Sequence, residues 1–92
     1  PGAPVAHINL GHAYQALGQT EKAIAEFEKS LVLLPDAPVI NYNIAAIYYQ
    51  QKQFDLAQRR FMAELVNNPQ NDQALHYLRI LEDKELRKVL EQ

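Results

Sequence analysis

Several kinds of chemistry are excluded by residue types and patterns that the sequence lacks. It contains no cysteine, so it forms no disulfide bond and performs no thiolate chemistry, although this absence does not indicate a compartment. Its apolar runs are far shorter than the roughly 20 residues of a membrane-spanning helix, and no signal peptide is visible. Its net charge of −2 is too small to favour nucleic acid or an anionic membrane as a partner.

The motifs of the common enzyme classes are missing as well. There is no glycine-rich phosphate loop, no G-x-S-x-G and no H-E-x-x-H. His7 and His12 lie five positions apart on one expected helix, whereas a zinc pair prefers a spacing of three or four. We therefore expect no catalytic residue, no metal and no cofactor, and we interpret these histidines and His76 as surface or groove residues.

The rest of the composition is ordinary. The chain has 92 residues, of which 48% are hydrophobic and 22% are charged, as is typical of one small soluble globular domain. Its stability should be modest, because a chain of this length buries only part of its surface. The opening PGAPVAH lacks an initiating Met, so we expect the chain to be a fragment of a longer one.

A repeat of 34 residues organises the sequence. When residues 7–40 are laid over 41–74, most of the matches are large apolar or small residues, where a packing constraint would act. The identical pairs are Asn9/Asn43, Tyr14/Tyr48, Gln19/Gln53, Ala23/Ala57, Phe27/Phe61, Leu31/Leu65, Val32/Val66 and Pro35/Pro69.

Each repeat has the three- and four-residue periodicity of two helices. Gly18 is expected to end the first helix, and Thr20 to cap the second; Asp55 takes the capping role in the second repeat. Pro35 and Pro38 separate the repeats, because proline is tolerated in a first helical turn but not inside a helix. The pattern predicts an all-α fold of about five helices, at about 4–17, 21–34, 38–51, 54–67 and 72–91.

The small residues of the repeat allow the helices to approach closely. Gly11 and Ala45 lie on first helices, and Ala23 and Ala57 lie on second helices, where only small side chains permit the shortest axial distances. The large aromatic residues should fill the wider parts of the gap. We therefore expect these four to be largely buried: Tyr14, Phe27, Tyr48 and Phe61.

This pattern resembles the tetratricopeptide repeat. The two copies read "LGHAY…AIAEF…P" and "IAAIY…AQRRF…P", cover residues 5–69 and lead into a third. They depart from the family pattern at His7, Asn41, Ala45 and Glu64. The resemblance implies one domain, residues 1–92, built as a helical-hairpin solenoid with a right-handed superhelix. Repeat one would span about 4–37, repeat two about 38–71, and a capping helix about 72–92.

The third unit does not continue the pattern. Arg79 and Glu82 occupy positions where a small residue and an aromatic residue would be needed, and the segment 72–92 has no Gly or Pro. We therefore expect one long helix whose apolar face covers the second repeat, with polar residues toward water, as solenoid ends require. The covering residues would be Ala74, Leu75, Leu78 and Leu81, and a second apolar stripe for self-association would be Leu86, Val89 and Leu90.

The front of the array carries no equivalent cap. Solenoids generally need about three repeats to be stable alone. We therefore expect either that further repeats precede this chain or that it forms a homo-oligomer.

A groove is the candidate binding site. The resemblance implies that first helices line a concave surface, which solenoids use for binding. It is neutral, rich in amides and aromatic, which suits a short extended peptide. Its predicted peptide-binding residues are Ile8, Asn9, His12, Tyr42, Asn43, Tyr49, Gln73, Tyr77 and Ile80.

Two binding modes of the family can be compared with these positions. The Lys/Asn/Asn/Lys/Arg clamp for chaperone C-termini is absent, because only Asn43 matches it. An asparagine ladder that holds ligand backbone fits Asn9 and Asn43 but is broken by Tyr77. The alternative is that both asparagines simply tolerate a half-exposed face, and the sequence leaves the two readings open.

The function that we predict is non-catalytic binding of a protein or peptide, as part of a scaffold. The alternative is a structural end-cap or oligomerisation segment whose groove binds nothing specific. An enzyme is not expected, and neither is binding to nucleic acid or to a membrane.

Overall fold

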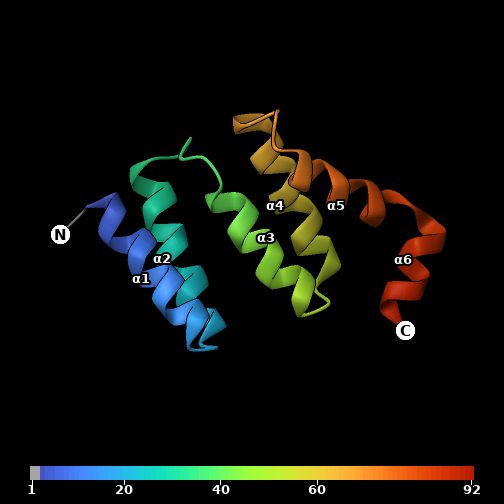
Figure 1. The fold of residues 1–92 in the computed structure, drawn as a ribbon, viewed down its shortest axis with the longest axis horizontal. Helices are drawn as coiled ribbons and strands as arrows, with labels where there is room; N and C mark the ends of the chain where they lie inside the picture. The colour runs from blue at the N-terminus through green and yellow to red at the C-terminus, as the bar shows by residue number, and fades with distance from the viewer. Residues whose placement is uncertain (1–2) are drawn as a thin grey trace. The chain divides into compact units, whose positions relative to one another are not determined.

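The computed structural model describes residues 3–92 and is helical in all its regular structure (Figure 1). The predicted all-α class is therefore confirmed. The helices are α1 (Pro4–Ala16), α2 (Thr20–Leu33), α3 (Ile40–Gln50), α4 (Phe54–Asn67), α5 (Asp72–Glu82) and α6 (Lys84–Glu91).

The chain forms two compact units, and each is described by itself. The first unit is Pro1–Ile40 and contains the antiparallel hairpin of α1 and α2, which lie side by side (Figure 1). The second unit is Asn41–Gln92 and contains nearly all of α3 together with α4, α5 and α6. The single solenoid domain and its right-handed superhelix stay predictions.

The two hairpin turns have the same hydrogen-bonding pattern. After α1, Gly18 has a φ of 76° and the Gln19 N–H donates to the Tyr14 carbonyl at 2.9 Å. After α3, Lys52 has a φ of 61° and the Gln53 N–H donates to the Tyr48 carbonyl at 2.9 Å. This is the Schellman arrangement, whose left-handed position Gly favours, so the predicted role of Gly18 is confirmed. Lys52 adopts the same left-handed conformation although it carries a side chain.

The predicted caps of the second helices are wrong by one or two positions. The N-caps are Gln19 and Gln53, and neither side chain forms a capping hydrogen bond. Thr20 is already the first residue of α2, and Asp55 lies in the first turn of α4. The tight turn explains this difference. Gln19 and Gln53 donate the last hydrogen bond to the preceding helix, and α2 and α4 begin at the very next residue.

In the first unit, the core rests on a close approach of α1 to α2. A Cβ placed on Gly11 would lie 2.5 Å from the Phe27 ring, so any larger residue in this position would force the ring to shift. Ala23 and Phe27 are completely buried, as predicted. Tyr14 and its counterpart Tyr48, which were expected to be largely buried with the two phenylalanines, are partly buried, and less completely than Phe27 and Phe61. A tyrosine buries its ring while its hydroxyl end stays in water.

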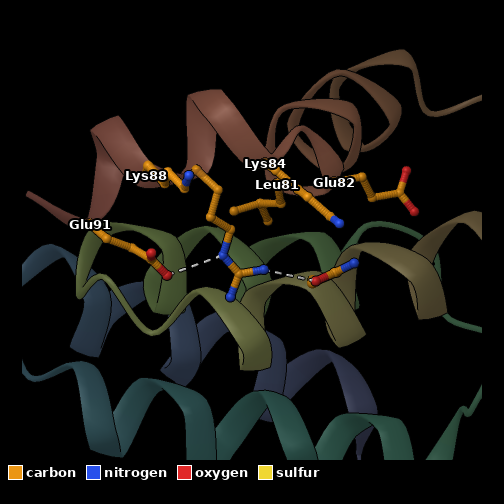
Figure 2. A pocket seen from close by; sticks show the side chains of 7 residues that line it. Leu81, Glu82, Lys84, Lys88 and Glu91 are labelled. Atoms are coloured by element: carbon orange, nitrogen blue, oxygen red, sulfur yellow. Dashed lines mark hydrogen bonds and ion pairs between the residues drawn. The ribbon is translucent and has the colours of Figure 1, made fainter.

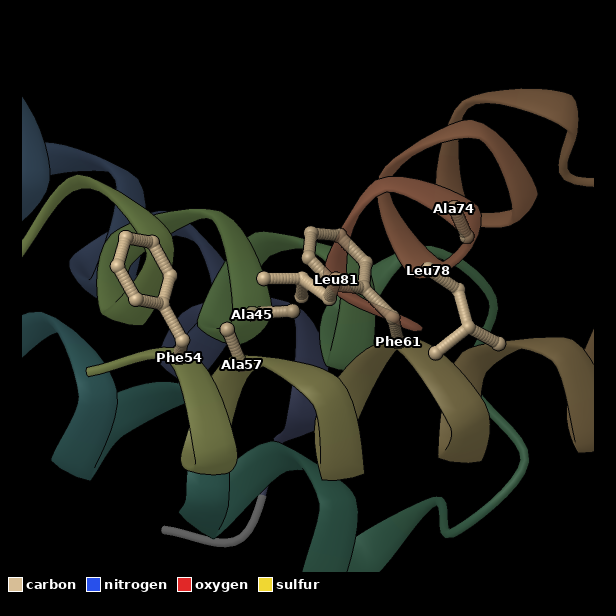
Figure 3. Close-up of a cluster of buried hydrophobic side chains, with 7 residues drawn as sticks. All are labelled: Ala45, Phe54, Ala57, Phe61, Ala74, Leu78 and Leu81. Atoms are coloured by element: carbon tan, nitrogen blue, oxygen red, sulfur yellow. The ribbon is translucent and has the colours of Figure 1, made fainter. Parts of the chain in front are cut away.

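In the second unit, one cluster of buried side chains joins α3, α4 and α5. Figure 3 shows these side chains converging from the three helices. The predicted contribution of Ala74, Leu78 and Leu81 is confirmed, and Leu75 is half-buried. The complete cluster is Ala45, Phe54, Ala57, Phe61, Ala74, Leu78 and Leu81.

The predicted single helix over 72–91 is wrong, because Asp83 divides it into α5 and α6. The Asp83 backbone is extended, with φ −82° and ψ 112°. Its Oδ1 accepts hydrogen bonds from the N–H groups of Glu85 and Leu86, at 3.0 and 3.1 Å. An aspartate N-cap can therefore end one helix and start another without any Gly or Pro.

The tail helix α6 is held against its own unit. The Arg87 guanidinium donates to Gln58 Oε1 at 3.1 Å and pairs with the Asp55 carboxylate, while lying 5.9 Å from the centre of the Phe54 ring. Leu90 packs against the core cluster. The predicted self-association stripe is thus divided: Leu86 and Val89 are 48% and 65% exposed, whereas Leu90 faces inward.

Candidate peptide-binding pocket

Three aromatic side chains gather around Tyr77 of α5 in the second unit and form an aromatic group with it. Its ring stacks on Phe61 of α4, with centroids 5.3 Å apart and an angle of 12°. Tyr49 meets it edge-on at 5.0 Å, and Tyr42 lies tilted at 6.4 Å. The resemblance to the tetratricopeptide repeat implied that Tyr42, Tyr49 and Tyr77 line one surface, and the structure brings these three predicted residues together.

A surface pocket of about 300 Å³ opens beside this aromatic group. It contains three of the predicted binding residues, Tyr42, Gln73 and Tyr77, together with Asp72 and His76. Tyr42 comes from α3 and the other four from the first turns of α5. The pocket thus combines aromatic surface with an amide, an imidazole and a carboxylate, within the second unit alone.

A buried carboxylate positions both walls of the pocket. Glu64 is fully buried and accepts hydrogen bonds from the Tyr42 N–H at 3.3 Å, Asn71 Nδ2 at 3.1 Å and Asn68 Nδ2 at 3.4 Å. Asn71 Oδ1 in turn accepts from the Ala74 N–H at 3.1 Å, which caps α5. Glu64 therefore links the start of α3 to the start of α5, which are the two elements that form the pocket.

Glu64 had been visible in the sequence only as a departure from the family pattern, at a position where a small residue is usual. Its counterpart 34 residues earlier is Ser30, which is also fully buried and donates to the Phe27 carbonyl at 2.6 Å. A buried charge or hydroxyl needs hydrogen-bond partners. A polar residue on the buried face of a helix was thus the available signal for this network.

The hydroxyls of Tyr42 and Tyr49 stay protonated in ordinary buffers. Burial, and secondarily the neighbouring Tyr77, raise the pKa of Tyr42 above its usual value. The same two causes raise the pKa of Tyr49. Both phenols are therefore neutral groups that can donate or accept a hydrogen bond toward a ligand.

The remaining predicted residues lie outside this pocket. Asn43 and Ile80 are half-buried in the second unit but do not line the pocket. In the first unit, Asn9 is exposed and Ile8 is half-buried, while the exposed His12 places its ring edge-on to Phe27 at 5.2 Å. The asparagine ladder requires Asn9 and Asn43 on one surface, and it stays a prediction.

Asp72 is the pocket residue that sequence reasoning missed. Its counterparts in the 34-residue register are Pro4 and Pro38. A charged residue at a position that otherwise holds proline was the signal that could have identified it. Asp72 is exposed and lies in the first turn of α5, beside the rings of Tyr42 and Tyr77.

A second, larger pocket of about 500 Å³ lies where α5 and α6 meet α4 (Figure 2). Charges of both signs line it, and its central Arg87 already pairs with Asp55, Gln58 and Glu91. Because its best hydrogen-bond donor is occupied, this pocket is a weaker ligand site than the aromatic one. Its lining residues are Gln58, Leu81, Glu82, Lys84, Arg87, Lys88 and Glu91.

Other kinds of site were sought in the part of the chain that the structure describes. Within residues 3–92, no three His, Cys, Asp or Glu side chains come close enough together to hold a metal ion. Over the same residues, no helix combines the length and the apolar character needed to cross a membrane.

Comparison with known proteins agrees with the helical hairpins described above. A family model described as TPR repeat, the tetratricopeptide repeat, matches residues 11–52. The matched segment runs from Gly11 on α1 to the turn at Lys52. No curated protein matches the chain.

Proposed function

This chain is a TPR-containing helical protein, and from that premise we propose that it binds an extended peptide segment of a protein partner in the pocket between α3 and α5. TPR repeats generally mediate protein–protein interaction and scaffolding, and the family is typically non-catalytic. The proposal adds a place and a kind of ligand to that general role.

The observation that carries the proposal is the composition of the pocket. Rings of Tyr42 and Tyr77 supply apolar area, while the Gln73 amide and the tyrosine hydroxyls can hydrogen-bond to a peptide backbone. Ligand sites in proteins are typically concave and apolar, with a few placed polar groups. At about 300 Å³, the pocket fits one side chain and its flanking backbone better than a whole folded partner.

The pocket walls are also held in place before any ligand arrives. Tyr77 is stacked on the buried Phe61, and the Tyr42 backbone is anchored on Glu64. A site that is already ordered loses less conformational entropy on binding. These contacts support a preformed peptide site over a surface that must reorganise.

The experiment is selection of binders from a displayed library of random 12-residue peptides, followed by affinity measurement on purified variants. Gln73→Ala and Tyr42→Phe each remove one hydrogen-bonding group from the pocket and should weaken the selected peptides by several-fold, because such bonds contribute about 0.5–1.5 kcal/mol. Gln53→Ala is the matched control, since Gln53 is exposed in the turn before α4. Unchanged affinity in both pocket variants would refute the site.

Self-association is a second candidate function, and one relationship within the repeat favours it. On α1, Ala6, Leu10 and Ala13 form an exposed apolar stripe, and Leu10 is 45% exposed. The residues 34 positions later on α3 are all buried, with exposures of 4%, 0% and 1% for Ile40, Ile44 and Ile47. The same face of the repeat is thus buried on α3 and exposed on α1. A second chain could cover the exposed face of α1.

A further inference from the structure

We propose that the pocket between α3 and α5 selects a basic side chain, arginine above all, within the peptide that it binds. This inference rests on the proposed peptide-binding function and adds the chemical class of the ligand. It is carried by the charge and the hydrogen-bonding character of the pocket lining, which the periodicity of the repeat did not anticipate.

The carboxylate of Asp72 is available to a ligand. Within residues 3–92, several other carboxylates are engaged, among them Glu26 with Lys29, Asp55 with Arg87, and Asp83 with the first N–H groups of α6. Over the same residues, Asp72 forms no ion pair and its side chain is exposed in the pocket. The pocket therefore carries an uncompensated negative charge.

The groups around Asp72 suit a cation as well. Tyr42 and Tyr77 line the pocket, and an aromatic ring attracts a guanidinium or ammonium through the negative charge of its π face. Tyrosine oxygens, the Gln73 carbonyl and an imidazole nitrogen can each accept a hydrogen bond. No Lys or Arg is among the lining residues of this pocket, so an acidic side chain would meet a like charge and no cation.

The N-terminus of α5 opposes a cation, but its effect is smaller. A helix N-terminus is equivalent to about half a positive charge, and Asp72 carries a full negative one. In addition, the Ala74 N–H already donates to Asn71 and does not point free into the pocket. The remaining potential at the pocket mouth is therefore negative.

Arginine fits this lining better than lysine does. Its planar guanidinium can stack on a tyrosine ring while its N–H fork bonds to a carboxylate, whereas an ammonium is a compact, strongly hydrated charge. A pocket of about 300 Å³ is at the lower end for ligand sites, which matches a single long side chain.

The test is the peptide selection on wild type and on Asp72→Asn, followed by titration of the best arginine peptide and of its citrulline twin, which has the same shape without the charge. On wild type, citrulline should weaken binding by about tenfold or more, because hydrogen bonds to charged groups contribute about 1.5–3 kcal/mol. On Asp72→Asn, the two peptides should differ by less than about threefold. Asp36→Asn, which removes an exposed loop carboxylate, should behave as wild type.

The outcomes separate this inference from the function on which it rests. Enriched peptides without a basic residue, or equal affinity for arginine and citrulline on wild type, would overturn the selectivity and leave peptide binding in place. Failure to enrich any peptide would overturn both. Melting curves of each variant show whether it is folded, and Asp72→Lys gives a second readout, since it should now favour Asp or Glu at the same peptide position.

Discussion

His7 Nδ1 lies 2.8 Å from Glu26 Oε1 in the first unit, and the same contact recurs in the second unit with different residues. There, Arg60 Nη1 donates to Asn41 Oδ1 at 3.1 Å. Both pairs are 19 positions apart, and the second pair is displaced by 34 from the first. The repeat therefore retains a polar tie between its two helices even though neither residue type is kept.

The first prediction concerns this tie in acid. Hydrogen bonds from His7 and then Lys29 lower the pKa of Glu26. Glu26 therefore binds a proton more readily in the unfolded chain than in the folded one. Its contribution to the free energy of unfolding is complete above its unfolded-state pKa and is lost as the pH falls through its lower folded-state pKa. Denaturation at a series of pH values from 6 to 3 should show a steeper acid loss for wild type than for Glu26→Gln.

Glu21→Gln is the control for that measurement. Glu21 is exposed in the first turn of the same helix, α2. Its substitution should leave most of the acid dependence intact. If Glu26→Gln and wild type lose stability in parallel as the pH falls, the hydrogen bond to His7 does not lower the pKa of Glu26 in the folded state relative to the unfolded state.

The second prediction concerns Gly11→Ala. The new methyl would meet the Phe27 ring at 2.5 Å, which should cost about 1–3 kcal/mol as overpacking. Alanine gains about 1 kcal/mol over glycine in a helix, so the two effects oppose each other. We expect a net loss of up to about 2 kcal/mol in the free energy of unfolding, measured by urea denaturation. A variant that is more stable than wild type would show that Phe27 moves aside without cost.

The third prediction concerns Glu64→Ala. The substitution leaves the Tyr42 N–H and two asparagine amides without their acceptor and opens a cavity. Together these effects should cost about 2–4 kcal/mol and should weaken any ligand of the pocket, since Tyr42 and α5 lose their common anchor. Glu82→Ala, at the exposed end of α5, should change stability by less than about 0.5 kcal/mol. Calorimetric melting of both variants tests the difference.

The sequence predicted those features that a fixed period determines. The 34-residue phase predicted the hairpins and the burial of Phe27 and Phe61, and the family resemblance implied the grouping of Tyr42 with Tyr77. It could not predict the break at Asp83, because an aspartate cap competes with helix continuation through local hydrogen bonds that the apolar pattern does not contain. Asp72 was missed for a similar reason. Periodicity identifies the positions that pack against other helices, whereas Asp72 is exposed and leaves no packing signal in the repeat.

The last prediction concerns self-association. Leu17, the C-cap of α1, is 70% exposed and continues the spacing of the α1 stripe by four residues. Covering this face with a second copy of the chain would remove Leu10, which is 45% exposed, and Leu17 from water. Light scattering at micromolar concentration should therefore report more than 10.5 kDa for wild type, and Leu10→Asp with Leu17→Asp should lower that mass.

Leu86→Asp with Val89→Asp tests the competing face on α6. Val32→Asp, at a residue 80% exposed on α2, is the control for added charge alone. If only the α6 variant lowers the mass, association uses the tail; if wild type is a strict monomer, the α1 stripe does not pair with a second copy and the self-association function is refuted.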